Sequence, residues 1–218
     1  MSAENTKQKI MIEALKLFSQ YGYEAVSVDQ IAKAVGIKAP SLYKHYKSKQ
    51  DIFDSILAKM EQLDEERAKE FDVPEGTIEQ MPEKYKTTQI HQAIAFSNAQ
   101  FIYWTEDEFA SCFRKMLILE QFRNEEMSRL YHQYICSAPL DYVSDLLFSL
   151  GFADYRELAV EFFAPMFLLY SVYDGSTNKE EIKKLLNNHF EKMRFRLESE
   201  SKKLKHCSLI ESNKINNL

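Results

Sequence analysis

The chain has 218 residues, of which 45% are hydrophobic and 28% charged, the proportions of a globular protein large enough to bury a core. It contains only five glycines, which leaves little room for phosphate-binding loops, dinucleotide fingerprints or tight hairpins. The net charge of −5 conceals an asymmetry, because residues 1–60 carry +3 and the remaining residues −8. A short basic segment on an acidic body is typical of a small electropositive docking surface.

Several functional classes lack their sequence signals. No apolar run approaches the ~18 residues of a membrane-spanning helix, and the polar start MSAENTKQK lacks the apolar region of a signal peptide. The three cysteines, Cys112, Cys136 and Cys207, are far apart, as in a reducing compartment. Neither a catalytic triad nor a set of metal ligands is recognisable, so we expect a cytoplasmic protein that is no enzyme and holds no metal or cofactor.

The first 60 residues predict four helices joined by short turns. Apolar residues at spacings of three and four indicate a helix over residues 4–21, which Gly22 ends. Ser27 and Gln30 form a capping-box pattern before a two-turn helix that Gly36 ends. Pro40 suits the first turn of a third helix, over residues 40–46, and Ser48 is the predicted N-cap of a fourth.

The third of these helices has an unusual outward face. Leu42 and Tyr46 are four residues apart and would face the core. The opposite side combines small, aromatic and cationic residues, where a purely solvated helix would show Glu and Lys pairs. Five lysines and no acidic residue lie between Asp29 and Asp51. Short helices with a glycine turn between the second and third indicate a helix-turn-helix arrangement, whose second helix enters the major groove of DNA.

Residues 10–53 resemble the DNA-binding domain of TetR-family (TetR/AcrR-like) transcriptional regulators. The matching positions have the family's spacing throughout; they are Ile10, Ala14, Leu17, Phe18, Gly22, Val26-Ser27-Val28, Ile31-Ala32, Val35-Gly36-Ile37, Leu42-Tyr43-Lys44-His45-Tyr46, Lys49 and Ile52-Phe53. Ser27 and Pro40 stand where the family more often has a threonine pair and a small residue. The resemblance implies an all-α fold, with an N-terminal three-helix helix-turn-helix domain and a larger helical ligand-binding and dimerisation domain.

The same resemblance assigns roles on DNA. The positions nearest base edges are Lys38, Ala39, Pro40, Ser41 and Lys44. Lysine donates hydrogen bonds to guanine, and small apolar groups pack on thymine methyls. The positions expected at phosphates are Ser27, Tyr43, His45 and Lys49. Ser27 and Lys49 also stand at helix starts, where unpaired backbone N–H groups favour an anion.

Beyond Met60 the resemblance concerns architecture only. Residues 71–82 contain two prolines and a glycine, which predict a loop. Thr105, Asp154 and Thr177 are predicted N-caps. Apolar periodicity predicts six helices, over residues 90–104, 106–124, 125–136, 138–150, 154–173 and 177–203. The expected domains are therefore residues 1–50 for DNA binding, 51–204 for ligand binding and dimerisation, and 205–218 as a disordered tail.

Two further sites are expected in the larger domain. The helix over residues 154–173 is apolar on nearly every face and must be buried on every side, for which a partner subunit is the natural second surface. The residues expected at this dimer interface are Phe162, Phe163, Phe167, Leu169, Leu186 and Phe190. Aromatic residues and methionines also suit an apolar effector pocket. Its expected lining is Phe96, Tyr103, Trp104, Phe113, Met116, Phe122, Tyr134, Phe163, Met166 and Tyr170.

These observations favour a dimeric transcriptional regulator, most simply a repressor that a small apolar ligand releases from a palindromic operator. Its expected partners are double-stranded DNA, a small-molecule effector and a second copy of the chain, without a membrane. The alternative is a helical interaction module whose helix-turn-helix docks a partner protein. The lysine-only segment favours DNA.

Overall fold

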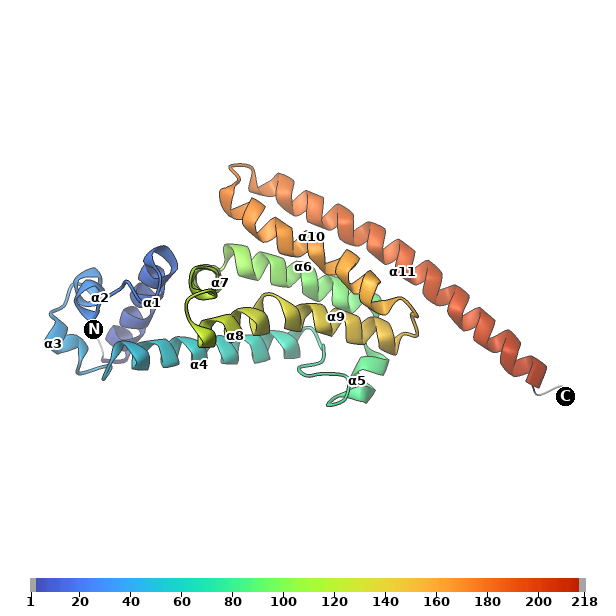
Figure 1. The fold of residues 1–218 in the computed structure, drawn as a ribbon, viewed down its shortest axis with the longest axis horizontal. Helices are drawn as coiled ribbons and strands as arrows, with labels where there is room; N and C mark the ends of the chain where they lie inside the picture. The colour runs from blue at the N-terminus through green and yellow to red at the C-terminus, as the bar shows by residue number, and fades with distance from the viewer. Residues whose placement is uncertain (1–2, 216–218) are drawn as a thin grey trace. The chain divides into compact units, whose positions relative to one another are not determined.

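The computed structural model describes the backbone of residues 3–215 and the side chains of residues 4–202. All regular elements in this part are α-helices, which confirms the predicted all-α fold (Figure 1). No helix within these limits combines the length and apolar character needed to cross a bilayer. The chain divides into two compact units, each built from two separate stretches of sequence.

The first unit comprises Met1–Arg67 and Tyr103–Ile135. It contains α1 (Ala3–Tyr21), α2 (Val28–Val35), α3 (Ala39–Leu42) and the greater part of α4 (Lys49–Glu70), together with α7 (Glu108–Glu120) and α8 (Glu125–Tyr134). Its core includes the α1 residues predicted to face inward, because Ile10, Ala14 and Phe18 are completely buried. α1 packs on both α2 and α7, so the N-terminal helices share a core with a later segment of the chain.

The second unit comprises Ala68–Ile102 and Cys136–Leu218. Its helices are α5 (Pro82–Thr87), most of α6 (Ile90–Glu106), α9 (Ser137–Ser149), α10 (Tyr155–Gly175) and α11 (Lys179–Ile215). α10 packs against α9 and α11, and Figure 1 shows α10 and α11 running side by side in opposite directions. Residues 71–81 form the loop that was predicted over residues 71–82, but Pro82 begins the short α5, which was not expected.

The last helix, α11, extends beyond residue 203, where the sequence predicted its end. α11 continues to Ile215, whereas the sequence analysis expects a disordered tail over residues 205–218. Side chains after Lys202 and the backbone of residues 216–218 lie outside the described residues. The predicted domain boundary after residue 50 coincides with the first turn of α4, one continuous helix, and stays a prediction.

Candidate nucleic-acid interface

The helix-turn-helix begins with a capping box that confirms the predicted start of α2. The Ser27 hydroxyl accepts a hydrogen bond from the Gln30 backbone N–H at 3.3 Å, and the Gln30 side chain accepts one from the Ser27 backbone N–H at 2.7 Å. Two backbone donors at the start of α2, which would otherwise lack partners, are satisfied in this way. The box fixes where α2 starts.

The turn between α2 and α3 depends on Gly36. Its φ of 82° lies in the left-handed region, which glycine occupies without steric cost. The Gly36 N–H donates to the Lys33 carbonyl at 3.1 Å, and the Ile37 N–H donates to the Ala32 carbonyl at 2.9 Å. These bonds satisfy carbonyls at the end of α2 and redirect the chain into α3.

The α3 region is attached to the core through two side chains. Leu42 is completely buried and Tyr46 is 2% exposed, as the predicted inward face requires. The Tyr46 hydroxyl donates to the Lys7 carbonyl of α1 at 3.2 Å. Regular α-helix ends at Leu42, and residues 43–46 continue as tight hydrogen-bonded turns instead of the helix predicted to residue 46. These contacts with the core and with α1 determine which residues of the α3 region face outward.

The predicted base-reading residues lie at the start of α3, within it and in the turns that follow it. Lys38, Pro40 and Lys44 are exposed, while Ala39 and Ser41 are half-buried. Lys38 precedes the helix in extended conformation and makes no side-chain cap. Exposed lysines thus precede and follow the small residues in sequence, and lysine can donate hydrogen bonds to a base edge.

The four predicted phosphate ligands have different surroundings. Tyr43 is 53% exposed and His45 half-buried, both within the turns after α3. The exposed Ser27 hydroxyl is engaged in the capping box. Lys49 donates from Nζ to the carbonyls of Tyr23 and Glu24 at 2.8 and 3.4 Å and lies 4.3 Å from the centre of the Tyr23 ring. Lys49 therefore braces the α1–α2 turn, a role that its spacing in the sequence did not reveal.

Tyr23 is a structural centre of this domain that sequence analysis missed. Its ring contacts Phe18 and Phe53 at centroid distances of 5.1 and 5.4 Å, and its hydroxyl donates to the Gln50 side chain at 2.9 Å. Burial raises the pKa of Tyr23 to about 12, and nearby carboxylates add to this effect. Tyr23 lies in a turn, where helical periodicity gives no indication of burial.

The aromatic residues expected at an effector pocket belong to both units. Phe96, Phe163, Met166 and Tyr170 lie in the second unit, whereas the first holds Tyr103, Trp104, Phe113, Met116 and Tyr134. In the first unit Tyr134 contacts Phe113 edge to face, at 5.4 Å between ring centres. Phe122 departs from the expectation, because the loop between α7 and α8 leaves it 89% exposed.

The residues expected at the dimer interface divide into a buried and an accessible set. Phe162, Phe163, Leu186 and Phe190 are at most 6% exposed, because α10 packs on α9 and α11; the Phe162 and Phe190 rings are 4.9 Å apart. Phe167 is 37% exposed and Leu169 half-buried. Within this chain the outer face of α10 is uncovered and exposes Val160, Phe167, Leu168 and Val172, so its burial by a partner subunit stays a prediction.

Metal binding finds no support in the side chains that the structure describes. Among these residues, no three histidine, cysteine or acidic side chains are grouped so as to hold an ion. Cys112 and Cys136 are unpaired thiols, each half-buried.

Comparisons with known proteins agree with this geometry. Residues 10–56 match the family model described as bacterial regulatory proteins, tetR family. The HTH-type transcriptional regulator AcrR of Shigella flexneri is 44% identical over 54 residues, 25% of each chain. The negative transcriptional regulator IcaR of Staphylococcus aureus (strain Newman) is 48% identical over 48 residues, 22% of this chain and 26% of the relative. The match spans about a quarter of the length of these curated relatives.

Solved structures extend the similarity of fold to most of the chain. The fatty acid degradation regulator FadR of Bacillus halodurans aligns over 86% of this chain and 94% of its own, with 17% identity and a TM-score of 0.57. SmeT, the repressor of a Stenotrophomonas maltophilia efflux pump, aligns over 86% and 87%, with 18% identity and a TM-score of 0.54. The arrangement of a helix-turn-helix domain followed by a helical domain is confirmed.

Proposed function

We propose that this chain, whose residues 10–56 match the model of the tetR family of bacterial regulatory proteins, is a dimeric, sequence-specific transcriptional repressor. The observation that carries the proposal is the exposed face of the α3 region, where Lys38 and Lys44 flank small residues above the buried Leu42 and Tyr46. Regulators of this family act on DNA and are not enzymes. The proposed site of action is the cytoplasm, where operator DNA lies.

Base reading is assigned to the exposed lysines and the small side chains between them. Lys38 and Lys44 donate hydrogen bonds to guanine O6 and N7, and Ala39 and Pro40 pack against a thymine methyl. Tyr43 and His45 contact phosphates, which position the domain without reading sequence. Lys49 contributes positive charge at the start of α4 while it holds the α1–α2 turn.

The outer faces of α10 and α11 support a two-fold dimer. Val160, Leu168 and Leu185 are each more than half exposed, and Phe167, Val172 and Phe195 extend the same apolar set. Exposed apolar side chains on two helices that pack together are what an interface between subunits would cover. A second copy of the chain would cover it and pair two recognition helices about one turn of DNA apart, ~34–36 Å.

The effector is proposed to be a small, largely apolar molecule bound among the aromatic residues of the helical domain. In the second unit the Tyr142 hydroxyl is buried without a hydrogen-bond partner, and the Tyr142 ring lies 6.0 Å from that of Phe96. An aromatic cluster with one unsatisfied polar group suits a ligand with one polar end. The curated relative IcaR is named a negative regulator, which supports repression as the direction of control.

DNA binding is tested by reversing charge on the recognition surface. Fluorescence anisotropy would compare the wild type with Lys38→Glu/Lys44→Glu on duplex DNA at increasing salt. The double variant should lose binding, and the wild-type affinity should fall steeply with salt because phosphate contacts release counterions. Lys192→Glu is the control, since Lys192 is an exposed residue of α11. If the double variant bound DNA as tightly as the wild type, or if the wild-type affinity did not depend on salt, the protein-docking module would be favoured instead.

A further inference from the structure

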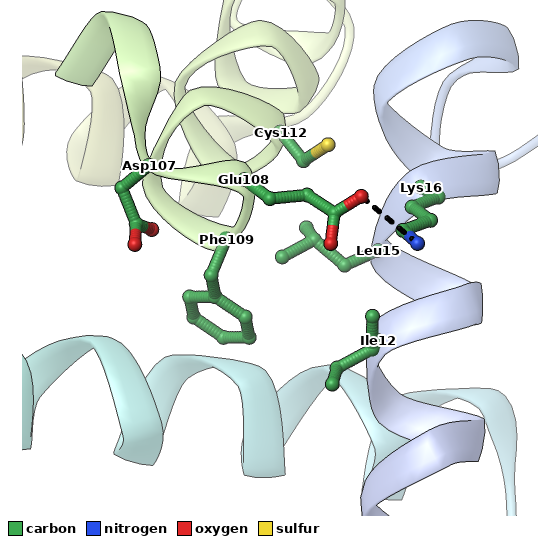
Figure 2. A pocket seen from close by; sticks show the side chains of 7 residues that line it. All are labelled: Ile12, Leu15, Lys16, Asp107, Glu108, Phe109 and Cys112. Atoms are coloured by element: carbon green, nitrogen blue, oxygen red, sulfur yellow. Dashed lines mark ion pairs between the residues drawn. The ribbon is translucent and has the colours of Figure 1, made fainter. Parts of the chain in front are cut away.

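A small cavity lies where α1 meets α7, inside the first unit. Its lining is Ile12, Leu15 and Lys16 from α1 and Asp107, Glu108, Phe109 and Cys112 from α7. Figure 2 shows the Glu108 side chain reaching from α7 toward Lys16 on α1, with Leu15 beside the pair. The cavity thus has an apolar part and a charged rim. None of its residues belongs to the DNA-reading surface or to the expected effector pocket.

The charged rim has more acidic than basic groups. Lys16 Nζ lies 2.9 Å from a Glu108 carboxylate oxygen and 3.4 Å from one of Glu13. Asp107 adds a third carboxylate, one oxygen of which accepts a hydrogen bond from the Ala110 N–H at 2.9 Å as the N-cap of α7. The hydrogen bond to Glu108 raises the pKa of Lys16, so its ammonium stays charged. Lys16 is therefore paired with two carboxylates, while that of Asp107 lies apart at the edge of the cavity (Figure 2), and the excess of negative charge favours an added cation.

The size and apolar lining of the cavity restrict what that cation can be. The volume is about 220 Å³, below the ~300–1,000 Å³ of sites for drug-sized ligands. An inorganic ion would leave the apolar side chains of Ile12, Leu15 and Phe109 without contacts. A small organic cation suits both the apolar part and the charged rim of the cavity. Its aromatic or aliphatic body contacts the apolar side chains, and the phenyl ring of Phe109 attracts its positive charge.

We propose that the α1–α7 cavity binds a small amphipathic organic cation, which competes with Lys16 for the Glu108 carboxylate. Lys16 and Glu108 form the ion pair that joins the two helices across this cavity. A bound amine would take the place of the Lys16 ammonium and lie between α1 and α7. Because α1 also packs on α2, occupation of the cavity acts on the packing of the helix-turn-helix. This site is additional to the apolar effector site, and its binding step does not depend on the proposed function.

Cys112 provides a direct readout of occupation, because its half-buried thiol lines the cavity. Alkylation by iodoacetamide would be followed on the full chain with benzylammonium, benzyl alcohol or benzoate present. Cleavage after Arg114 and Arg129 places Cys112 and Cys136 in different peptides, so mass spectrometry reports both thiols separately. Benzylammonium should slow alkylation of Cys112 but not of Cys136. The neutral alcohol and the anion should protect much less.

Two glutamates in equivalent positions supply the test of the carboxylate. Glu108 is the first helical residue of α7 after the N-cap Asp107, and Glu125 is the first of α8 after the N-cap Asn124. Glu108→Gln should weaken protection by benzylammonium roughly fivefold, the upper end for an exposed ion pair. Glu125→Gln should leave it unchanged. Equal protection of Cys112 by benzyl alcohol, or no protection by benzylammonium, would overturn the proposal. So would a Glu108→Gln variant in which the same benzylammonium concentration gives half-maximal protection as in the wild type.

Discussion

Gly22, at the end of α1, combines a left-handed backbone with a close neighbour. Its φ is 86°, and a β-carbon at this position would overlap a carboxylate oxygen of Glu120. Glu120 is completely buried at the end of α7, so its side chain has little room to move away. The close approach of α1 to α7 thus depends on the absence of a side chain at residue 22.

Gly22→Ala should therefore destabilise the chain more than Gly36→Ala. Both glycines have φ above 80°, but nothing lies within 4 Å of a β-carbon built on Gly36. The left-handed conformation alone costs an alanine ~1–2 kcal/mol. Urea unfolding should show this loss for Gly36→Ala and a greater one for Gly22→Ala. Equal losses would mean that the contact with Glu120 contributes nothing.

Lys44 and Tyr43 are adjacent residues with different proposed roles. Lys44→Ala should relax sequence preference at one base pair, where the wild type discriminates by ~1–3 kcal/mol. Tyr43→Ala should weaken binding to all sequences alike, since phosphate contacts carry no sequence information. Affinities measured on a set of single-base operator variants distinguish the two patterns. A uniform loss for Lys44→Ala would contradict its role in base reading.

At the level of elements, the sequence predicted where helices exist better than which residue caps them. Ser27 and Ser48 both accept the predicted backbone hydrogen bond. Asp107, not Thr105, caps α7, because α6 continues through Glu106 and keeps Thr105 within a helix. Asn178 likewise replaces Thr177, as its side chain accepts from the Glu181 N–H at 3.3 Å. Neighbouring residues of similar capping ability cannot be ranked from sequence, since tertiary packing decides where the preceding helix ends.

The outer face of α10 shows a second limit of sequence reasoning. An apolar composition on all sides predicted burial shared with a partner subunit, without saying which residues the chain itself covers. Phe162 is 2% exposed and Leu168 63% exposed. Periodicity identifies the apolar faces of a helix, but it does not show which of these faces other helices of the same chain cover. The side facing α9 and α11 is covered by the chain itself. Only the structure assigns Phe162 to the core and Leu168 to the surface.

The turn that joins α1 to α2 should become unstable at alkaline pH. The pKa of Tyr23 rises from 10.0 to about 12, mainly through burial. A folded-state pKa above the unfolded value gives stability that is complete below pH 10 and is lost as pH rises toward 12. In Tyr23→Phe, the free energy of unfolding measured with urea should therefore decline less between pH 10 and pH 12 than in the wild type. An identical decline in wild type and Tyr23→Phe would contradict the assignment.

For the whole molecule, the sequence predicted the helical class and the DNA-binding domain but not the two compact units. Residues 103–135 join the N-terminal unit through the packing of α1 on α7. This contact links helices whose midpoints are about 100 residues apart, and no local pattern indicates it. Hydrophobic periodicity gave most helices their approximate limits, but it contains no information about which helices pack together.

The dimer proposal predicts the effect of a charge on the exposed apolar face. Leu168→Glu should yield a folded monomer, because burial of an unpaired carboxylate in the interface opposes association. Phe122→Glu is the matched control, since Phe122 is also an exposed apolar residue but lies in the other unit. Sedimentation equilibrium should give half the wild-type mass for Leu168→Glu and the full mass for Phe122→Glu. A dimer that survives Leu168→Glu would exclude this face.

A dimer of this chain should read one palindromic DNA site, each copy contacting one half-site. The most direct test is selection of bound sequences from a random pool of double-stranded DNA by the purified protein, at ~0.15 M salt. We expect an inverted repeat whose half-site centres are ~10 base pairs, one helical turn, apart. Sequences that stay random after selection, with the protein shown to be folded and dimeric, would contradict it.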